Sequence, residues 1–266
     1  MKKDKEDIST EENYGSGIYL DTQSWTPQWA EILAKVPSCT PQTGPWPIHL
    51  VLPIPERGGT LVVYDQDIVC YSSYNTLTTI YRDDHTMAAD YPVTCLTLRK
   101  LGAFQKRQHP MINSPHVLVP LGNTDECEWV NPLSIHSVWE EPARTYIKMA
   151  SGPGIIVKNR KKTIEKYAVN ALLALACSER DMNPMVWAYR NSNPLNYLDL
   201  LDTPFMNKLS RRRRLRKFPF DEGVYLEEFA LRRGHQRILK ALKRSGKTDF
   251  SFESLTDLLD DDDDDE

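Results

Sequence analysis

Apolar and polar residues alternate along the middle of the chain, between about residues 60 and 150. Such alternation puts successive side chains on opposite faces of a β-strand, and the runs are separated by Gly, Asn, Asp or Pro. The pattern predicts about seven to nine short strands in a mainly antiparallel module. The predicted strand segments of this module are TLVVYDQDIVCYSS (60–73, a hairpin around DQD), TLTTIYRDD (76–84), PVTCLTLRK (92–100), PHVLVPL (115–121), CEWVN (127–131), IHSVWEE (135–141), TYIKMA (145–150) and SGPGIIVKN (151–159, a turn and then a strand). Before the module, IHLVL (48–52) can form a further strand.

The segment PVTCLTLRK (92–100) shows the period most clearly. Its odd-numbered residues from 93 to 97 lie opposite the even-numbered residues from 94 to 98, which predicts a half-buried strand.

Two other regions have the helical period. KKTIEKYAVNALLALACSERD (161–181) repeats apolar residues every three or four positions and predicts an amphipathic helix. A second helical region covers 223–246, with an interruption at Gly234. The segment SWTPQWAEILAKV (24–36) predicts a short helix that begins at Thr26-Pro27.

These elements predict an α+β fold: a mainly antiparallel β module with a packed C-terminal helix and a further helical segment. The chain has 266 residues, of which 40% are hydrophobic, enough for one core with appendages. The predicted organisation is an N-terminal extension (1–50), partly disordered, a β-rich domain with its helix (51–205), a basic helical segment (206–247) and an acidic, disordered tail (248–266).

Charge is distributed unevenly along the chain, although the net charge is only −4. Residues 206–247 hold 14 Lys or Arg against 4 Asp or Glu, and residues 248–266 hold 10 acids and no base. A basic block followed by an acidic block suggests a polyanion-binding surface with an intramolecular competitor.

The chain carries no sign of export or membrane insertion. Its N-terminus lacks an apolar core segment, its longest apolar runs are shorter than a membrane helix needs, and its mean hydropathy is −0.51. We expect a cytoplasmic protein without a membrane partner. Five widely spaced cysteines, none in a CxxC pair, predict free thiols in a reducing compartment.

No catalytic or metal-binding motif stands out. P-loop, GxGxxG and GxSxG sequences are absent, and His109, His116, Cys127 and His136 are spaced too widely for a compact zinc site. A cysteine on an alternating apolar strand is more often core than nucleophile. The sequence therefore predicts no enzyme, no catalytic residue, no cofactor and no metal.

Basic clusters are the best candidates for function. Dense Arg and Lys side chains neutralise phosphates and release counterions, and arginine also fits the narrow minor groove of AT-rich DNA. A solvated charge run is the alternative interpretation of each cluster. The candidate DNA-binding residues are Arg211, Arg212, Arg213, Arg214, Arg216 and Lys217, together with Lys158, Arg160, Lys161 and Lys162. A third, weaker cluster comprises Arg99, Lys100, Lys106 and Arg107.

The order of motifs resembles the competence transcription factor family, ComK. The resemblance lies in GGTLVVYDQDIVCYSSYNTLTTIYRDD, FQKRQHPMI, VLVPL, CEWVNPLSIHSV and TIEKYAVNALLAL, between about Gly58 and Leu175. The family's markers fall on Pro110, Ile112, Pro120, Cys127, Trp129, Val130 and His136.

The resemblance implies a DNA-binding transcription activator that regulates competence genes for DNA uptake. Such proteins bind paired AT-rich boxes of double-stranded DNA as dimers or higher oligomers, which places them at the nucleoid. An adaptor delivers them to a Clp protease, and KFPFDEG (217–223) is similar in character and place to the segment that engages it. The alternative is a regulatory protein without DNA, acting through protein–protein contacts of its basic and acidic C-terminus.

Three roles are open for the acidic tail. It can be a solubilising segment, a linear motif for a partner protein, or a polyphosphate mimic that folds back on the arginine run. In the last case, deletion of residues 260–266 should raise DNA affinity at low salt, where charge competition is least screened. Fluorescence anisotropy across salt measures this, and equal affinity with and without the tail would contradict autoinhibition.

Overall fold

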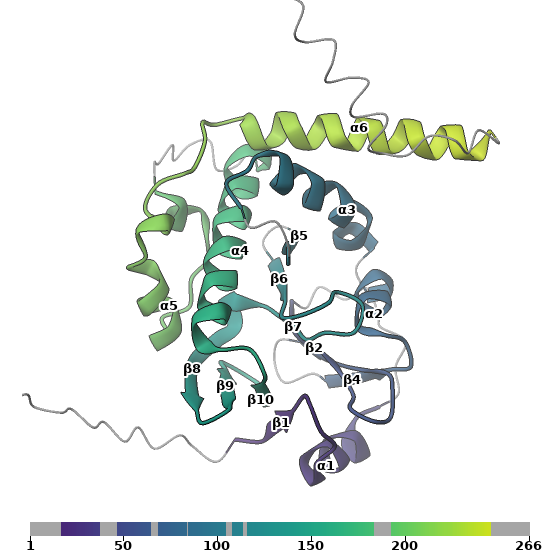
Figure 1. Cartoon of the computed structure of the whole chain (residues 1–266), viewed down its shortest axis with the longest axis vertical. Coiled ribbons are helices and arrows are strands. Elements are labelled where there is room, and N and C mark those ends of the chain that lie inside the picture. Colours follow the sequence, from purple (N-terminus) through teal and green to yellow (C-terminus); the bar gives the residue numbers. More distant parts are fainter. Residues whose placement is uncertain are drawn as a thin grey trace, which may run out of the picture.

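The computed structural model describes residues 17–37, 47–64, 69–83, 85–104, 108–113, 116–183 and 193–245. It has an α+β fold with a six-stranded sheet, a four-stranded sheet and six α-helices in the described part (Figure 1). The elements in chain order are β1 (Tyr19–Asp21), α1 (Pro27–Lys35), β2 (Ile48–Pro53), β3 (Thr60–Tyr64), β4 (Val69–Ser72), α2 (Thr76–Asp83), α3 (His85–Lys100), β5 (Met111–Asn113), β6 (His116–Pro120), β7 (Trp129–Val130), η2 (Pro132–Ser134), β8 (Ile135–Glu141), β9 (Arg144–Met149), β10 (Gly154–Val157), α4 (Lys161–Met182), η4 (Pro194–Tyr197), α5 (Pro204–Ser210), η5 (Arg213–Leu215) and α6 (Val224–Arg244).

The six-stranded sheet is antiparallel throughout and has the strand order β4-β3-β2-β7-β6-β5. Both of its faces are buried, which explains the nearly continuous apolar sequences of β2 and β3. Leu50 and Leu52 of β2 belong to the main core, whereas Val51 packs on the opposite face in a second cluster. The second cluster also contains Ile80 of α2 and Tyr91 of α3, so these helices cover that face.

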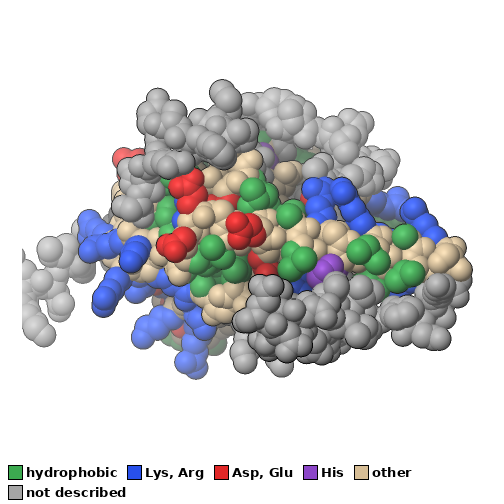
Figure 2. All heavy atoms as spheres, turned by 90° about the horizontal axis from the view of Figure 1, so that it is seen from above, with side chains coloured by type: hydrophobic (Ala, Val, Ile, Leu, Met, Phe, Trp, Pro, Cys, Tyr) green, Lys and Arg blue, Asp and Glu red, His purple; other side chains and the backbone are tan. Residues whose placement is uncertain are grey.

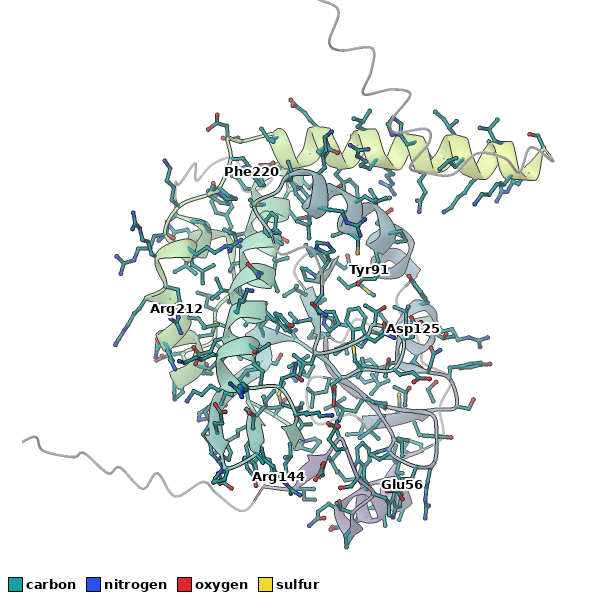
Figure 3. All side chains as sticks on the ribbon, in the orientation of Figure 1. Glu56, Tyr91, Asp125, Arg144, Arg212 and Phe220 are labelled. Atoms are coloured by element: carbon teal, nitrogen blue, oxygen red, sulfur yellow. The ribbon has the colours of Figure 1, made fainter. Side chains whose placement is uncertain are left out.

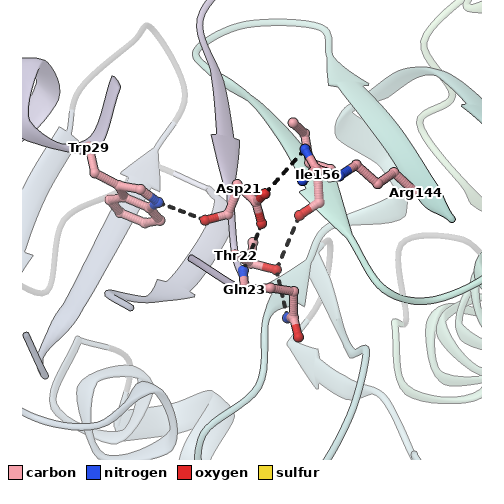
Figure 4. Close-up of polar contacts among 6 residues, drawn as sticks. All are labelled: Asp21, Thr22, Gln23, Trp29, Arg144 and Ile156. Carbon is pink, nitrogen blue, oxygen red and sulfur yellow. Dashed lines mark hydrogen bonds and ion pairs between the residues drawn. The ribbon is translucent and has the colours of Figure 1, made fainter. Parts of the chain in front are cut away.

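The four-stranded sheet has the order β1-β10-β9-β8, and β1 runs parallel to β10. Figure 4 shows how the end of β1 is held. The Thr22 hydroxyl donates to the Ile156 carbonyl over 3.2 Å, Asp21 pairs with Arg144 at 3.5 Å, and the indole N–H of buried Trp29 donates to the Asp21 carbonyl at 2.7 Å. The last contact also fixes α1 against the sheet. The helix predicted to begin at Thr26-Pro27 is confirmed, because α1 begins at Pro27 with Thr26 as its N-cap residue.

Helix α4 is the centre of the molecule (Figure 1). It contacts β5 and β6 of one sheet, β8 of the other, η4, η5 and α6. The sequence predicts this helix correctly, but as amphipathic, whereas 16 of its 22 residues are buried. A helix surrounded by other elements needs apolar or small residues around most of its circumference, as in AVNALLALAC (168–177).

Two predicted strands are helices in the structure. Segment 76–84 was expected to be a strand because it is rich in β-branched residues, yet residues 76–83 form α2. The Asn75 side chain accepts a 2.8 Å hydrogen bond from the Thr78 N–H, as a helix cap does. The Thr76 and Thr79 hydroxyls are buried and donate to the Asp125 carbonyl and the Ser72 hydroxyl, so tertiary contacts override β-propensity.

The predicted strand 92–100 is likewise the second part of α3. Its buried residues include Val93, Thr94, Thr97 and Leu98, the spacing of a helix face and not of a strand. The alternation was misleading because threonines, Thr94 and Thr97, occupy both faces of the expected strand. Pro92, the first residue of the predicted strand, lies inside the helix.

The interruption expected at Gly234 is also wrong, because α6 continues through this residue as one helix of 21 residues. The other predicted strands are confirmed where the structure describes them. They include the two antiparallel strands of the 60–73 hairpin. Predictions for residues 1–15, Cys39, Lys106, Arg107 and the acidic tail fall outside the described residues. Within the described ranges, no helix has the length and apolarity to cross a membrane.

A buried ion pair at the end of α4 holds the segment that leads into α6. Arg180 and Asp181 contact each other at 2.7 Å, with side chains 7% and 0% exposed. The Arg180 guanidinium donates to the Phe220 and Asp221 carbonyls and lies 4.1 Å from the Phe218 ring centroid. The second carboxylate oxygen of Asp181 accepts the Tyr225 N–H at 3.0 Å, in the first turn of α6. Because Gly223 offers no side chain there, Asp181 caps this helix from α4.

Removal of the cation from this pair should destabilise the chain strongly. Arg180→Met leaves the Asp181 carboxylate buried without its partner, which we expect to cost about 3 kcal/mol of unfolding free energy. Urea denaturation measures the loss. The control Lys35→Met, which breaks an exposed pair with Glu31, should cost less than about 1 kcal/mol. Similar losses in the two variants would contradict the role given to Arg180.

Candidate nucleic-acid interface

Two basic clusters that are about fifty residues apart in the sequence lie together in the structure. They form the walls of an open cleft of about 560 Å³ between α4, α5 and the segment 212–214. Seven cations and two acids line it, so the cleft is strongly positive. The charged lining residues are Lys161, Lys162, Lys166, Lys208, Arg212, Arg213, Arg214, Glu140 and Glu165.

Helix geometry explains one wall. Lining residues of α4 fall at 161, 162, 165, 166, 169 and 170, which is one face of a helix. The other wall begins with Lys208 in α5 and continues four residues later with Arg212, just after the helix ends. Leu215 is fully buried, and it anchors the arginine segment to the core while Arg213 and Arg214 point outward.

Glu165 organises the cations at the floor of the cleft. Its side chain is 4% exposed and accepts hydrogen bonds from Lys208 at 2.6 Å and from Arg212. Burial acts to raise the pKa of Glu165, but the hydrogen bonds and charges of Lys208 and Arg212 outweigh it and hold the pKa below its usual range. The acid therefore stays ionised and fixes two long cationic side chains in place.

Lys161 shows how crowded the positive charge is. Burial, and then the charge of nearby Lys208, lower the pKa of the Lys161 ammonium, against the opposing effect of Glu165 and Glu140. A bound anion would counter the Lys208 contribution to the lowered pKa, because it would offset the repulsion between the two ammonium groups.

Half of the candidate DNA-binding residues reach the cleft. Lys161, Lys162, Arg212, Arg213 and Arg214 line it. The other five are exposed but are not among the lining residues; they are Lys158, Arg160, Arg211, Arg216 and Lys217.

The cleft cations differ in how far they are already engaged. Arg214 donates to the Ala103 carbonyl, at the end of the α3 region. By contrast, the side chains of Lys162, Lys166 and Arg213 make no hydrogen bond or ion pair with any residue that the structure describes. These cations are available for a ligand.

Lys166, Lys208 and Glu165 line the cleft but are not among the candidate residues predicted from the sequence. Glu165 and Lys166 lie in the correctly predicted helix, one turn after Lys161 and Lys162. The four-residue spacing alone therefore predicts that these side chains share one helix face. Lys208 could not be found in this way, because the predicted basic helical segment (206–247) did not define a separate helix at residues 204–210 or its packing beside α4.

The described cysteines are free thiols, as predicted, and three have raised pKa values. Burial raises the pKa of Cys127 to about 12, of Cys177 to about 12 and of Cys95 to about 11, so these thiols are protonated at neutral pH. The described ranges contain no group of His, Cys, Asp or Glu side chains that could hold a metal ion.

No family model, no curated protein and no solved structure matches this chain. The resemblance to ComK remains an inference from the motifs, and the function has to be argued from the cleft itself.

The Glu165 contacts generate a pH-dependent prediction. A folded-state pKa below the ordinary value of 4.5 means that the carboxylate stabilises the folded chain above that pH, and that this contribution is lost as the pH falls through the lower folded-state value. Glu165→Gln should cost about 1–2 kcal/mol at neutral pH, since both cations are half exposed, and the cost should shrink in acid. Urea denaturation at several pH values measures it.

Glu140→Gln is the control, because Glu140 lines the same cleft but is exposed. Its effect should be small at every pH. A loss in Glu165→Gln that did not depend on pH would show that the Glu165 charge does not contribute.

Proposed function

We propose that the protein binds double-stranded DNA through the basic cleft between α4, α5 and the segment 212–214, with the exposed cations next to it in 211–217. The observation that carries the proposal is the convergence of two separate basic clusters on one open surface, with Lys162, Lys166 and Arg213 uncommitted to other described residues. A solvated charge run needs no such convergence. Figure 2, which looks onto α6, shows a group of Lys and Arg side chains at the end of the molecule where Figure 1 places α5.

Phosphate binding is the chemistry that this arrangement supports. Exposed Arg and Lys side chains on the rim can replace the counterions of a DNA backbone, and each replaced counterion adds to affinity at low salt. Glu165 keeps Lys208 and Arg212 from folding away, so part of the surface is ordered before DNA arrives. Pre-ordering lowers the entropy lost on binding.

The ComK resemblance gives the proposal its narrower form. In that form the protein is a transcription activator of competence genes that recognises AT-rich promoter boxes, and its exposed arginines would enter a narrow minor groove. Oligomerisation and delivery to a Clp protease by an adaptor belong to this narrower proposal. They are separate from DNA binding and can fail without it.

The first experiment compares two duplexes of equal length, one with paired AT-rich boxes and one GC-rich, by fluorescence anisotropy across salt. We expect tighter binding to the AT-rich duplex and a steep loss of affinity as salt rises. Equal binding to both would support DNA binding without AT preference. Binding to neither would refute the proposal and favour the protein–protein alternative.

Charge reversal locates the surface. In the double variant Lys162→Glu/Arg213→Glu, two uncommitted cations of the cleft become repulsive to phosphate. Affinity should fall at least tenfold, and the slope of log K against log salt should decrease by about 2. The matched control is Arg237→Glu/Lys240→Glu on the exposed part of α6, which changes net charge equally. Equal losses in both variants would show that overall charge, and not the cleft, determines binding.

A further inference from the structure

Helix α6 carries apolar side chains on two sides. One side is buried against α3 and α4 and includes Tyr225, Phe229 and Leu239. The other side includes Leu231 and Ile238, which are 47% and 48% exposed. Figure 2, which looks onto α6, shows hydrophobic side chains along this outer side. The helix therefore has an apolar surface that the described part of the fold does not bury.

The outer apolar residues form one continuous stripe. Leu231, Gly234, Ile238 and Leu242 follow each other at spacings of three and four residues, which places them on one face of the helix. Leu242 is partly exposed, and a Cβ on Gly234 would meet no atom within 4 Å. The C-terminal part of α6 extends past α3 (Figure 1). A contiguous exposed apolar surface marks an interaction site, whereas a single exposed leucine does not.

Cations border this stripe. Arg233, Arg237, Lys240 and Arg244 are exposed and recur at spacings of four and three residues, so they form a row on one flank of the stripe. Arg233 pairs with Asp90 of α3 at 3.3 Å. The other three side chains make no hydrogen bond or ion pair with any residue that the structure describes. The outer surface of α6 thus suits a segment that combines apolar and acidic residues.

We propose that the C-terminal segment FSFESLTDLL (250–259) of the same chain packs on this stripe as a short helix antiparallel to α6. The segment has Phe252, Leu255 and Leu259 at helical spacing. Residues 248–266 hold 10 acids and no base, which complements the row of cations. The arginine segment 211–217 fits the apolar residues less well, because its exposed residues are all Arg or Lys.

The length of the chain agrees with this packing. Four residues (246–249) separate the segment from Ser245, a usual length for a connection between antiparallel helices. The first of them is Gly246, the residue type that commonly follows a helix C-cap. Ten residues of helix reach about 15 Å back along α6, and the stripe from Leu231 to Leu242 is about 16 Å long by the same rise per residue.

A second copy of the chain is the rival occupant of the stripe. It would bring another α6 with the same row of cations, and so no acidic partner for them. The inference goes beyond DNA binding and does not depend on it, because the segment contacts α6 and not the residues that line the cleft.

Photo-cross-linking tests the packing on the full chain, without DNA. Leu255→benzoylphenylalanine puts the probe in the middle of the segment, and peptide mass spectrometry locates the link. We expect links to residues 231–242 within one molecule. Adding Leu231→Ser/Ile238→Ser should lower their yield about tenfold, because two aliphatic contacts are lost. The control Leu226→Ser removes a side chain that is 41% exposed on α6 but lies beyond the stripe, and should leave the yield unchanged.

Each other outcome would overturn the proposal. Links mainly between two molecules, with a yield that rises with protein concentration, would show that a second copy covers the stripe. Links only to 211–217 would place the tail on the arginine segment, and the absence of any link would leave the stripe without this occupant. The positions of the links in the chain without serine substitutions decide the question even if the double variant fails to fold. None of these results bears on DNA binding, which the duplex titrations judge separately.

Discussion

The contact between Arg180 and Asp181 at the end of α4 is the constraint on which the C-terminal half of the structure depends. Arg180 holds the chain after the arginine segment by donating to the Phe220 and Asp221 carbonyls. Asp181 caps α6. Figure 3 shows Phe220 beside this end of α4 and Arg212 farther along the same helix. The two ends of segment 211–223 are thus tied to one helix, at Glu165 through Arg212 and at Arg180. A highly charged segment with few apolar residues is kept on the surface by these two attachments and by buried Leu215 and Phe218.

The cleft illustrates how an acid can serve a basic surface. Without Glu165, Lys208 and Arg212 would repel each other and Lys161 across the same small volume. With it, two charges are neutralised locally, and their positions become fixed by hydrogen bonds, at the cost of part of the positive potential. The cations that stay uncommitted are on the rim, where desolvation on binding a phosphate costs least.

Sequence patterns predicted the elements whose apolar residues match the faces that are buried. β2, β3 and the hairpin to β4 are runs of β-branched and aromatic residues buried on one or both faces, and α4 has an unambiguous period. The patterns failed where local and tertiary preferences disagree, as in α2, whose threonines favour strands until Asn75 caps a helix and neighbours accept their hydroxyls. The basic clusters could be predicted because their Lys and Arg residues are nearly consecutive in the sequence. That Lys161 and Arg212 share a cleft depends on the packing of α5 against β8, and no local pattern contains it.

The parallel pairing of β1 with β10 has a consequence for synthesis. Thr22 and its partner Ile156 are 134 positions apart, so the first strand of the four-stranded sheet cannot be paired until the last one has been made. At translation rates of about 5–20 residues per second, β1 waits on the order of ten seconds with its backbone groups and apolar Leu20 unprotected. Closing so long a loop is also entropically slow, which makes this pairing a late event in folding. The N-terminal strand would then be the segment most in need of protection while the chain is still on the ribosome.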